Sequence, residues 1–366
     1  MVKSIVSKRM DNIESSGIRR IFDLAKSVKD PVNLGIGEPD FDVPDVLKDS
    51  MINAIKSSCS KYTPSIGNPQ LIEKINSKLS KENSIENGKT IITTGVSGGL
   101  FLAFNALLDP GDEIIIPDPY FVIYKQLANF IGAKPVFTGI DIDFDELSKK
   151  VSSRTKAIII NSPNNPTGKV YGKAMLEKIA DFANEHDLVV ISDEIYEKFI
   201  YDKEHFSIGS IYDKTITLNG FSKSHAIPGW RIGYAHGPEA IIDAMTKLQQ
   251  YTFVCTPSIV QKACLDSFDI DIIKYIRDYK NKRDMLYNGI KDNFEVKKPD
   301  GAFYIYPKAP DGDGMEFVEK AIQKNLLIVP GNVFSESNTH FRISFAASDE
   351  TIKKGIDILN GIGKFK

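Results

Sequence analysis

The sequence predicts an α/β protein in which a mostly parallel sheet carries helices on both faces, together with a smaller α+β lobe. The first observation is that short runs rich in Ile and Val alternate with helical stretches through the centre of the chain. Runs that are apolar on both faces are typical of parallel strands buried between two helix layers. The second observation is that both ends of the chain combine short strand-like runs with charged helices instead. A large central domain and a small terminal domain are therefore expected.

Six apolar runs predict the strands of the central sheet, and four stretches between or after them predict helices. The strand-like runs cover residues 90–94, 113–116, 134–137, 157–160, 188–192 and 215–218. The helical stretches cover residues 99–108, 122–131, 173–185 and 239–249. Strands that alternate with helices of this length form parallel sheets, because each helix carries the chain back to the start of the next strand.

The two ends of the chain predict the small lobe. Residues 2–32 are expected to form one amphipathic helix and a connector, and a charged helix is expected over residues 271–288. Three strand-like runs and two helices then cover residues 302–306, 326–329, 341–344, 315–324 and 350–362. The predicted division has three parts: an N-terminal segment that joins the small domain (1–40), a large domain (41–275) and the C-terminal part of the small domain (276–366).

The composition of the 366 residues excludes several classes of protein. Hydrophobic residues make up 42% and charged residues 26%, which excludes a mainly disordered chain, a collagen and a disulfide scaffold. The formal net charge is −2, so nothing favours nucleic acid or an anionic membrane as a partner. The cysteines and histidines lack the spacing of metal ligands, so no metal site is expected. No apolar run approaches the roughly 20 residues of a membrane span and no apolar signal core opens the chain, so a cytoplasmic protein is expected.

Ligands of open α/β sheets bind at the carboxyl ends of the strands, so the residues after each predicted strand are candidates. Gly95, Val96 and Ser97 follow the first strand and precede a predicted helix. Glycines let the backbone approach an anion closely, and a helix N-terminus offers it free N–H groups. A tight turn that binds nothing would have the same sequence, so this loop alone does not establish a phosphate site.

Two further strand ends carry polar side chains. Asn165 lies in a turn with two prolines and a glycine, which makes the turn rigid enough to direct its amide. Asp193 directly follows a strand, and Tyr196 comes three residues later, so a carboxylate and a phenol are expected at the rim of the sheet. The alternative for Asn165 is an ordinary turn that binds nothing, and the alternative for Asp193 is an aspartate that caps a helix.

The last predicted strand is followed by basic residues. Ser222 and Lys223 come shortly after it, and Arg231 follows in a Gly-Trp-Arg sequence. A lysine at a strand end among small and apolar neighbours is desolvated, which lowers its pKa and makes the amine nucleophilic. A solvated surface lysine is the alternative.

Together these groups match the partners of pyridoxal phosphate. Lys223 would bond covalently to the cofactor, and Asp193 would keep the pyridine nitrogen protonated so that the ring accepts electrons. Tyr196 and Asn165 would donate hydrogen bonds to the ring oxygen. The phosphate would be neutralised by Gly95, Val96, Ser97, Ser222 and Arg231.

Eight sequence motifs extend this pattern almost from end to end. They are NLGIGEPDF at 33–41, YTPSIG at 62–67, NNPTG at 164–168, DEIY at 193–196, SK at 222–223, GWR at 229–231, PDGAFY at 299–304 and FRIS at 341–344. In this order they resemble the motifs of fold-type I, class I/II pyridoxal-phosphate-dependent aminotransferases, in the subgroup of aspartate and aromatic aminotransferases. An ordered set of this length is highly specific.

The resemblance implies a seven-stranded, mostly parallel sheet in a large domain that binds pyridoxal 5'-phosphate, beside a small α+β domain. It assigns Arg342 to the substrate α-carboxylate, for which a planar guanidinium suits a bidentate pair. Gly37 and Asn165 match further substrate-binding positions, and Phe121 matches the ring that stacks on the cofactor, although ordinary core packing is equally compatible with it. Tyr62 matches a tyrosine that reaches the phosphate in the neighbouring subunit, which implies a homodimer with shared active sites.

Three positions depart from the family pattern. Pro228 stands where a threonine often precedes Gly-Trp-Arg, so a hydroxyl contact is lost there. Gly220 stands where some relatives carry a phosphate-binding serine, and Ser222 is expected to substitute for it. Val96 replaces a small residue in the phosphate loop, which a backbone N–H donor tolerates.

The expected activity is that of an aminotransferase, which moves the amino group of an L-amino acid to 2-oxoglutarate in two half-reactions. Aspartate is the first expected donor, followed by aromatic amino acids and alanine. The alternative is a pyridoxal-phosphate-dependent C–S β-lyase of the same fold, which expels a sulfur leaving group. A non-enzymatic amino-acid sensor is disfavoured by the complete set of reactive groups, and a nucleotide-binding α/β enzyme would not explain Lys223 together with Asp193.

Overall fold

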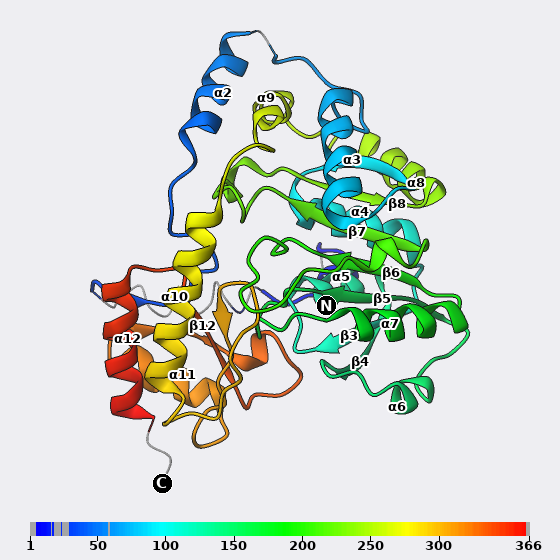
Figure 1. Cartoon of the computed structure of the whole chain (residues 1–366). Coiled ribbons are helices and arrows are strands. Elements are labelled where there is room, and N and C mark those ends of the chain that lie inside the picture. The colour runs from blue at the N-terminus through cyan, green and yellow to red at the C-terminus, as the bar shows by residue number, and fades with distance from the viewer. Residues whose placement is uncertain (1–4, 16, 18–22, 24–28, 58, 364–366) are drawn as a thin grey trace.

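The central sheet has seven strands in the order β2-β8-β7-β6-β5-β3-β4 (Figure 1). The computed structural model describes residues 5–15, 17, 23, 29–57 and 59–363. The strands are β2 (Lys89–Thr93), β3 (Glu113–Asp118), β4 (Lys134–Gly139), β5 (Thr155–Asn161), β6 (Val189–Asp193), β7 (Thr215–Gly220) and β8 (Gly233–Gly237). Neighbours from β4 to β7 pair in parallel, and β8 is antiparallel to both β7 and β2. The mostly parallel α/β sheet is therefore confirmed.

Strand β8 is the member of the sheet that the sequence did not predict. Its residues, Gly-Tyr-Ala-His-Gly, include two glycines and no β-branched side chain, so they carry little intrinsic preference for a strand. It forms because β7 and β2 offer hydrogen-bonding partners on both sides, and Tyr234 and Ala235 are buried there. Tertiary context overrides local propensity at this point.

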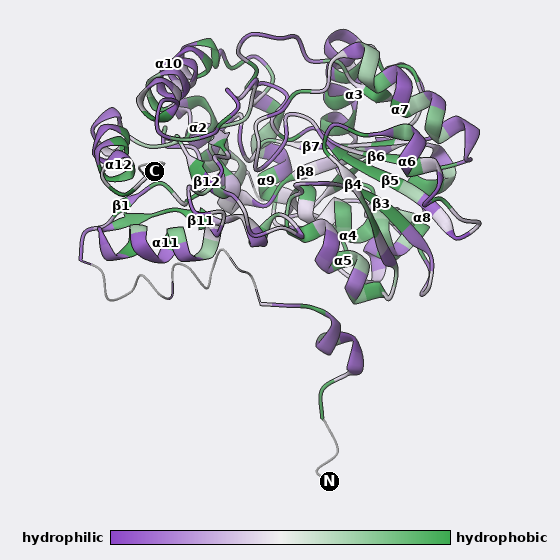
Figure 2. Ribbon diagram, turned by 90° about the horizontal axis from the view of Figure 1, so that it is seen from below, coloured by the Kyte–Doolittle hydropathy of each residue, from purple (hydrophilic) through white to green (hydrophobic). Residues whose placement is uncertain are grey.

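Helices cover both faces of the sheet, because successive strand residues point to opposite sides. The covering helices are α4 (Gly95–Leu107), α5 (Ile123–Ile131) and α8 (Glu239–Tyr251) on one face and α6 (Phe144–Ser148) and α7 (Lys173–Glu185) on the other. In β5, Ala157 and Ile159 join the core under α4, α5 and α8, whereas Ile158 and Ile160 join the core under α7. Figure 2 shows the apolar strands enclosed between helices whose outer turns are hydrophilic.

Helix α4 begins at Gly95, four residues before its predicted start at 99. Glycines are poor helix formers, so the local sequence hides this first turn. They are nevertheless required by close packing, because a Cβ atom on Gly99 would lie 2.8 Å from a methyl carbon of Leu218 in β7. The glycine loop that was expected to precede the helix is therefore the first turn of the helix itself.

The two ends of the chain meet in a second, smaller assembly. Strand β1 (Val32–Asn33) pairs in parallel with β10 (Leu326–Leu327), and three further strands form an antiparallel sheet in the order β11-β12-β9. The other elements are β9 (Tyr304–Ile305), β11 (Val329–Pro330), β12 (Phe341–Ser344), α10 (Ile273–Ile290), α11 (Gly314–Gln323) and α12 (Asp349–Ile362). Their buried side chains form one apolar core, and Figure 1 shows α10 and α12 next to each other on one side of β12.

The remaining elements share a core with β2 and β8 or connect the two assemblies. They are α2 (Asp45–Lys56), α3 (Pro69–Asn83), α9 (Ser258–Ala263) and the short 3-10 turns η3 (Ile208–Ser210), η4 (Pro228–Trp230), η5 (Cys264–Asp266) and η6 (Gly331–Val333). Of the helix expected over residues 2–32, the described part contains the 3-10 turn η1 (Lys8–Asn12), and much of that prediction falls outside the described residues. The division of the chain at residues 40 and 275 stays a prediction, and α10 spans the second boundary.

Within the described residues, no helix combines the length and the apolar character needed to cross a membrane.

We expect the substitution Gly233→Ala to destabilise the protein by about 1–3 kcal/mol, because β8 lies too close to its neighbours to accept a methyl group. A Cβ atom at Gly233 would lie 2.9 Å from the carbonyl oxygen of Asn219 and 3.0 Å from the backbone nitrogen of Val96. Both are backbone atoms, so neither can swing away. Urea unfolding followed by circular dichroism measures the change.

The matched control is Gly139→Ala at the end of β4, where an added Cβ atom would meet nothing within 4 Å. It should change the free energy of unfolding by less than about 0.5 kcal/mol. Equal stabilities of the two variants would contradict the close approach at β8.

Candidate active site

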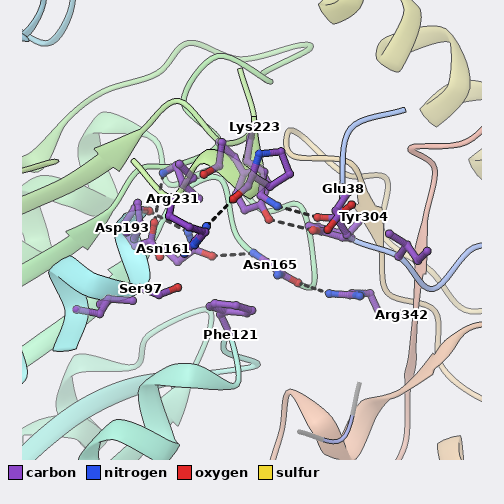
Figure 3. Close-up of a pocket in the computed structure, with 18 residues that line it drawn as sticks. Glu38, Ser97, Phe121, Asn161, Asn165, Asp193, Lys223, Arg231, Tyr304 and Arg342 are labelled. Carbon is purple, nitrogen blue, oxygen red and sulfur yellow. Dashed lines mark hydrogen bonds between the residues drawn. The ribbon is translucent and has the colours of Figure 1, made fainter. Parts of the chain in front are cut away.

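A cavity of about 460 Å³ lies where the carboxyl ends of the parallel strands face the small lobe (Figure 3). Its walls come from the first turn of α4, from residues after β3, β5, β6 and β7, from an N-terminal loop and from the small lobe. The lining residues are Ile36, Gly37, Glu38, Val96, Ser97, Leu100, Phe121, Asn161, Asn165, Asp193, Ile195, Tyr196, Ser222, Lys223, Pro228, Arg231, Tyr304 and Arg342. All the residues predicted for the site line it except Gly95, which lies behind Arg231, and Tyr62.

Lys223 provides the amine of the site. Its Nζ donates a hydrogen bond of 2.7 Å to the carbonyl oxygen of Gly37, which belongs to the N-terminal loop. Burial lowers the pKa of Lys223 to about 8, although the nearby negative charge of Glu38 opposes this shift. The positive charges of Arg342 and Arg231 lower the pKa further. A large neutral fraction of the amine near pH 8 makes it a nucleophile, as its sequence context predicted.

Asp193 ends β6 and is 2% exposed. One carboxylate oxygen accepts a hydrogen bond of 2.7 Å from the hydroxyl of Tyr124, and the other accepts one from the backbone N–H of Ile195. Burial nevertheless raises the pKa of Asp193 to about 6. Since these two donors are neutral, the carboxylate would be stabilised most by a cationic group in the cavity.

The turn after β6 is fixed from behind by a buried carboxylate. Glu194 accepts hydrogen bonds from the hydroxyls of Ser192 and Ser207 and from Nε2 of His205, at 2.7–2.9 Å. Its backbone N–H donates to the carbonyl of Leu218 in β7. These bonds hold the segment that carries Asp193 and Tyr196 on either side.

The first turn of α4 and Arg231 form a cradle suited to an anion. Gly95 has a φ of 67°, and a Cβ atom there would lie 2.7 Å from Nη2 of Arg231. Arg231 itself has a φ of 55° and donates through Nη1 to the carbonyl of Pro228. Free N–H groups at the helix N-terminus, the guanidinium and the hydroxyls of Ser97 and Ser222 in the same wall suit a phosphate.

Arg342 lies on β12 at the opposite end of the cavity and is 1% exposed. Its guanidinium carbon lies 4.5 Å from the ring centroids of both Tyr304 and Phe334. It donates to the amide oxygen of Asn165 at 3.0 Å and to the carbonyl of Gly35 at 2.8 Å. Its Nε is buried and has no hydrogen-bond partner among the described residues. A buried cation with neutral partners and an unused donor suits a ligand carboxylate.

Asn165 is held in place by Asn161, which was not among the predicted site residues. The side-chain oxygen of Asn161 accepts the backbone N–H of Asn165, and its amide donates to the carbonyl of Asp193. Figure 3 shows Asn165 reaching from this anchor towards Arg342. Asn161 directly follows the predicted strand at 157–160, so the rule that strand ends carry ligands would have found it.

Three other contributors were also not selected from the sequence. Glu38 and Tyr304 line the cavity and belong to motifs already quoted, NLGIGEPDF and PDGAFY. Tyr124 has no sequence signal, because an aromatic residue in an apolar helix looks like core. Among the selected residues, Phe121 lines the cavity with its ring edge-on to that of Tyr124, at 5.9 Å between centroids.

Tyr62 lies outside the cavity and is 83% exposed in the single chain. The described chain therefore does not bring it to the other site residues, and the role predicted for it requires a second subunit.

Comparison with known proteins assigns this arrangement to a family. The family model "Aminotransferase class I and II" matches residues 29–359. The chain belongs to the class I and II aminotransferases.

Relatives that match this aminotransferase over nearly its whole length are also named as aminotransferases. It is 40% identical to the "Probable aspartate aminotransferase" of Methanocaldococcus jannaschii, over 98% of this chain and 100% of the relative. It is 36% identical to "Aromatic-amino-acid aminotransferase 2" of Thermococcus litoralis, over 99% of each chain. The solved structure of aspartate aminotransferase from Thermus thermophilus with maleate superposes with a TM-score of 0.94 and 34% identity, over 98% of this chain and 100% of that one. The fold-type I architecture expected from the motifs is thus confirmed.

The aminotransferases of this family use pyridoxal phosphate, and the residues present fit that group. The carboxylate of Asp193 is buried, and its hydrogen-bond donors among the described residues are neutral. Gly95 leaves room for Arg231 beside the first turn of α4, and Lys223 belongs to the same cavity lining. Each of the cofactor's reactive parts therefore has a chemically matching partner.

We expect the amine of Lys223 to react with small acylating reagents at lower pH than ordinary lysines, because burial lowers its pKa to about 8. The neutral, reactive form becomes the major one above that pH. Acetylation rates of individual lysines in the cofactor-free protein, measured by mass spectrometry from pH 7 to 10, should show a midpoint near 8 for Lys223.

Lys89 is the internal reference, because hydrogen bonds with Asp243 and Glu239 raise its pKa. Its rate should still increase where that of Lys223 has levelled off. A midpoint for Lys223 at or above that of Lys89 would contradict the desolvated environment.

Proposed function

We propose that this aminotransferase moves the amino group of an L-amino acid to 2-oxoglutarate, with pyridoxal 5'-phosphate bound covalently to Lys223. The observation that carries the proposal is that one cavity combines a buried amine of lowered pKa, a buried carboxylate and a buried arginine with an unused donor. When bound, the cofactor supplies an electron sink for the carbanion formed at the substrate Cα.

The residues of the chain would then have separate tasks. Lys223, once released by the substrate amine, would accept the Cα proton at Nζ and return it as an acid. Asp193, held by Tyr124, would keep a proton on the ring nitrogen, and burial from water strengthens that pair. Tyr196 and Asn165 would donate to the ring oxygen.

Substrate and cofactor ends of the cavity have different donors. Arg342 would bind the substrate α-carboxylate through Nε and a terminal nitrogen, with Gly37 on the adjacent loop. The phosphate would rest on Gly95, Val96, Ser97, Ser222 and Arg231, and the ring of Phe121 would stack on the pyridine. No metal enters this scheme.

Aspartate is the proposed donor, with aromatic amino acids and alanine next. The names of the relatives, which include aspartate and aromatic-amino-acid aminotransferases, support this order. A C–S β-lyase of the same fold is the alternative, since both reactions begin with loss of the Cα proton.

We also propose a cytoplasmic homodimer with shared active sites and no nucleic-acid or membrane partner. Large apolar side chains are exposed on the single chain, which supports a partner surface. They include Ile52 and Ile55 on α2 and Tyr251 at the end of α8, at 49%, 59% and 84% exposure. Tyr62 belongs to the same part of the chain as α2, so a second subunit could bring it to the phosphate of its partner.

We expect Lys223→Ala to reduce turnover at least about 10³-fold, because the proton at Cα loses its acceptor. The assay couples a panel of amino donors, with 2-oxoglutarate as acceptor, to the appearance of glutamate. Lys149→Ala, at an exposed position, is the control and should keep wild-type activity.

Aspartate should give the highest kcat/KM of the panel. A higher value for an aromatic donor or for alanine would contradict the donor assignment and leave transamination intact. Release of pyruvate and ammonia from cystathionine without any 2-oxo acid would instead establish the β-lyase. Retention of most activity by Lys223→Ala would overturn the mechanism.

We expect Tyr62→Phe to weaken the binding of pyridoxal phosphate about 10-fold, because a hydrogen bond to a charged phosphate is lost. Light scattering should give the wild type twice the 40.7 kDa of one chain, and the variant should keep that mass. Equilibrium dialysis measures the affinity, with Tyr287→Phe on α10 as the matched loss of a hydroxyl. If the Tyr62→Phe variant is dimeric and binds pyridoxal phosphate as tightly as the wild type, the proposed shared site is wrong.

A further inference from the structure

Tyr304 enters the site from the small lobe. It lies on β9, where it pairs with Ser344 of β12 two residues from Arg342, and it is 1% exposed. Its ring packs edge-on against that of Tyr196 in the large assembly, with centroids 5.7 Å apart. Figure 3 shows its side chain reaching into the cavity from the side of Arg342. The residue is thus placed where the two halves of the site meet.

The hydroxyl of Tyr304 makes two contacts that matter for the chemistry. It forms a hydrogen bond of 2.9 Å with the hydroxyl of Tyr196. It also lies against the N-terminal loop, because a Cβ atom on Gly37 would be only 2.5 Å from it. The ring of Tyr304 supports the guanidinium of Arg342 at the same time.

The two phenols hold two protons but share one hydrogen bond. Burial raises the pKa of both Tyr196 and Tyr304, so both hydroxyls stay protonated. One proton therefore lies between them, and the other points elsewhere. If Tyr304 is the donor, the proton of Tyr196 is free to point at a ligand in the cavity.

We propose that Tyr304 is a positioning residue that donates its hydroxyl proton to Tyr196 and so directs the Tyr196 proton at the ring oxygen of the bound cofactor. The proposal deepens the function proposed above and rests on it. A donor that itself accepts a hydrogen bond is polarised and donates more strongly, so the Tyr304 hydroxyl strengthens the Tyr196 contact. The guanidinium of Arg342 lies 4.5 Å from the ring centroid of Tyr304, and a positive charge this close to a phenol ring makes its hydroxyl a stronger proton donor.

The consequence is a shift in the protonation of the cofactor linkage to Lys223. A hydrogen bond to the ring oxygen withdraws electron density from that oxygen. The oxygen then attracts the proton on the nitrogen of Lys223 less strongly, which lowers the pKa of the linkage. Removing the Tyr304 hydroxyl should therefore raise the pKa of the linkage, by less than removal of the Tyr196 hydroxyl does.

The test is a pH titration of the visible absorbance of the holoenzyme in the wild type and in Tyr304→Phe. The expected result is a midpoint higher by roughly 0.3–1 pH unit, a two- to tenfold increase in proton affinity. Tyr306→Phe is the matched control, because Tyr306 lies two residues away and its hydroxyl donates to the carbonyl of Gly331 instead. Its midpoint should equal that of the wild type.

A double variant separates action through Tyr196 from a general effect on the pocket. In the Tyr196→Phe background, adding Tyr304→Phe should leave the midpoint where Tyr196→Phe alone puts it. An equal shift in both backgrounds would overturn the proposal, and so would an unchanged midpoint in Tyr304→Phe. If the wild type binds no pyridoxal phosphate at all, the proposed function fails instead, so the two failures are distinguishable.

Discussion

The constraint on which this structure depends is the burial of charged groups whose hydrogen-bond partners, in the described part of the chain, are neutral. Lys223, Asp193 and Arg342 all line one cavity away from bulk water. Asp193 accepts hydrogen bonds from neutral donors, and Lys223 and Arg342 donate to neutral acceptors. Burying such a group without an opposite charge as partner costs on the order of several kcal/mol of folding free energy. Other interactions in the fold must offset this cost. Here the gain comes from the apolar cores on both faces of the sheet and from the small lobe. The same desolvation produces the reactivity, because it lowers the pKa of the amine and raises that of the carboxylate.

Closely packed backbone segments bring these charged side chains together in one cavity. Parallel strands β5, β6 and β7 end side by side, and Asp193 at the end of β6 lines the same cavity as Asn165 and Lys223, which follow β5 and β7 within a few residues. Glycine at position 233 lets β8 lie against the backbone at the start of α4. A second layer of bonds around Glu194 then holds the turn after β6. Rigidity of this kind is what a site needs when its partners must be in position before the ligand arrives.

The sequence predicted the strand ends well because a buried parallel strand leaves a continuous apolar signal and its ligand-binding residue comes next along the chain. It could not predict β8 or the first turn of α4, since their glycines have weak local preferences and the structure there is imposed by packing against β7. The role of Tyr124 could not be predicted from the sequence either, because its hydrogen bond to Asp193 depends on how α5 packs on the sheet. Tyr62 remains a prediction for a similar reason, as its proposed contact crosses to another chain.

The placement of the proposed substrate-binding residues on the chain ends has a physical consequence. Gly37 follows β1, and Arg342 and Tyr304 lie on β12 and β9, so the pairing of β1 with β10 and the small sheet together fix the substrate end of the cavity. Arg342 also donates directly to the carbonyl of Gly35, which ties the N-terminal loop to the strand that carries the arginine. The proposed substrate end of the cavity is therefore built by the two ends of the chain, whereas Asp193 and Lys223 are placed by the central sheet. Tyr304 lies where the two parts meet.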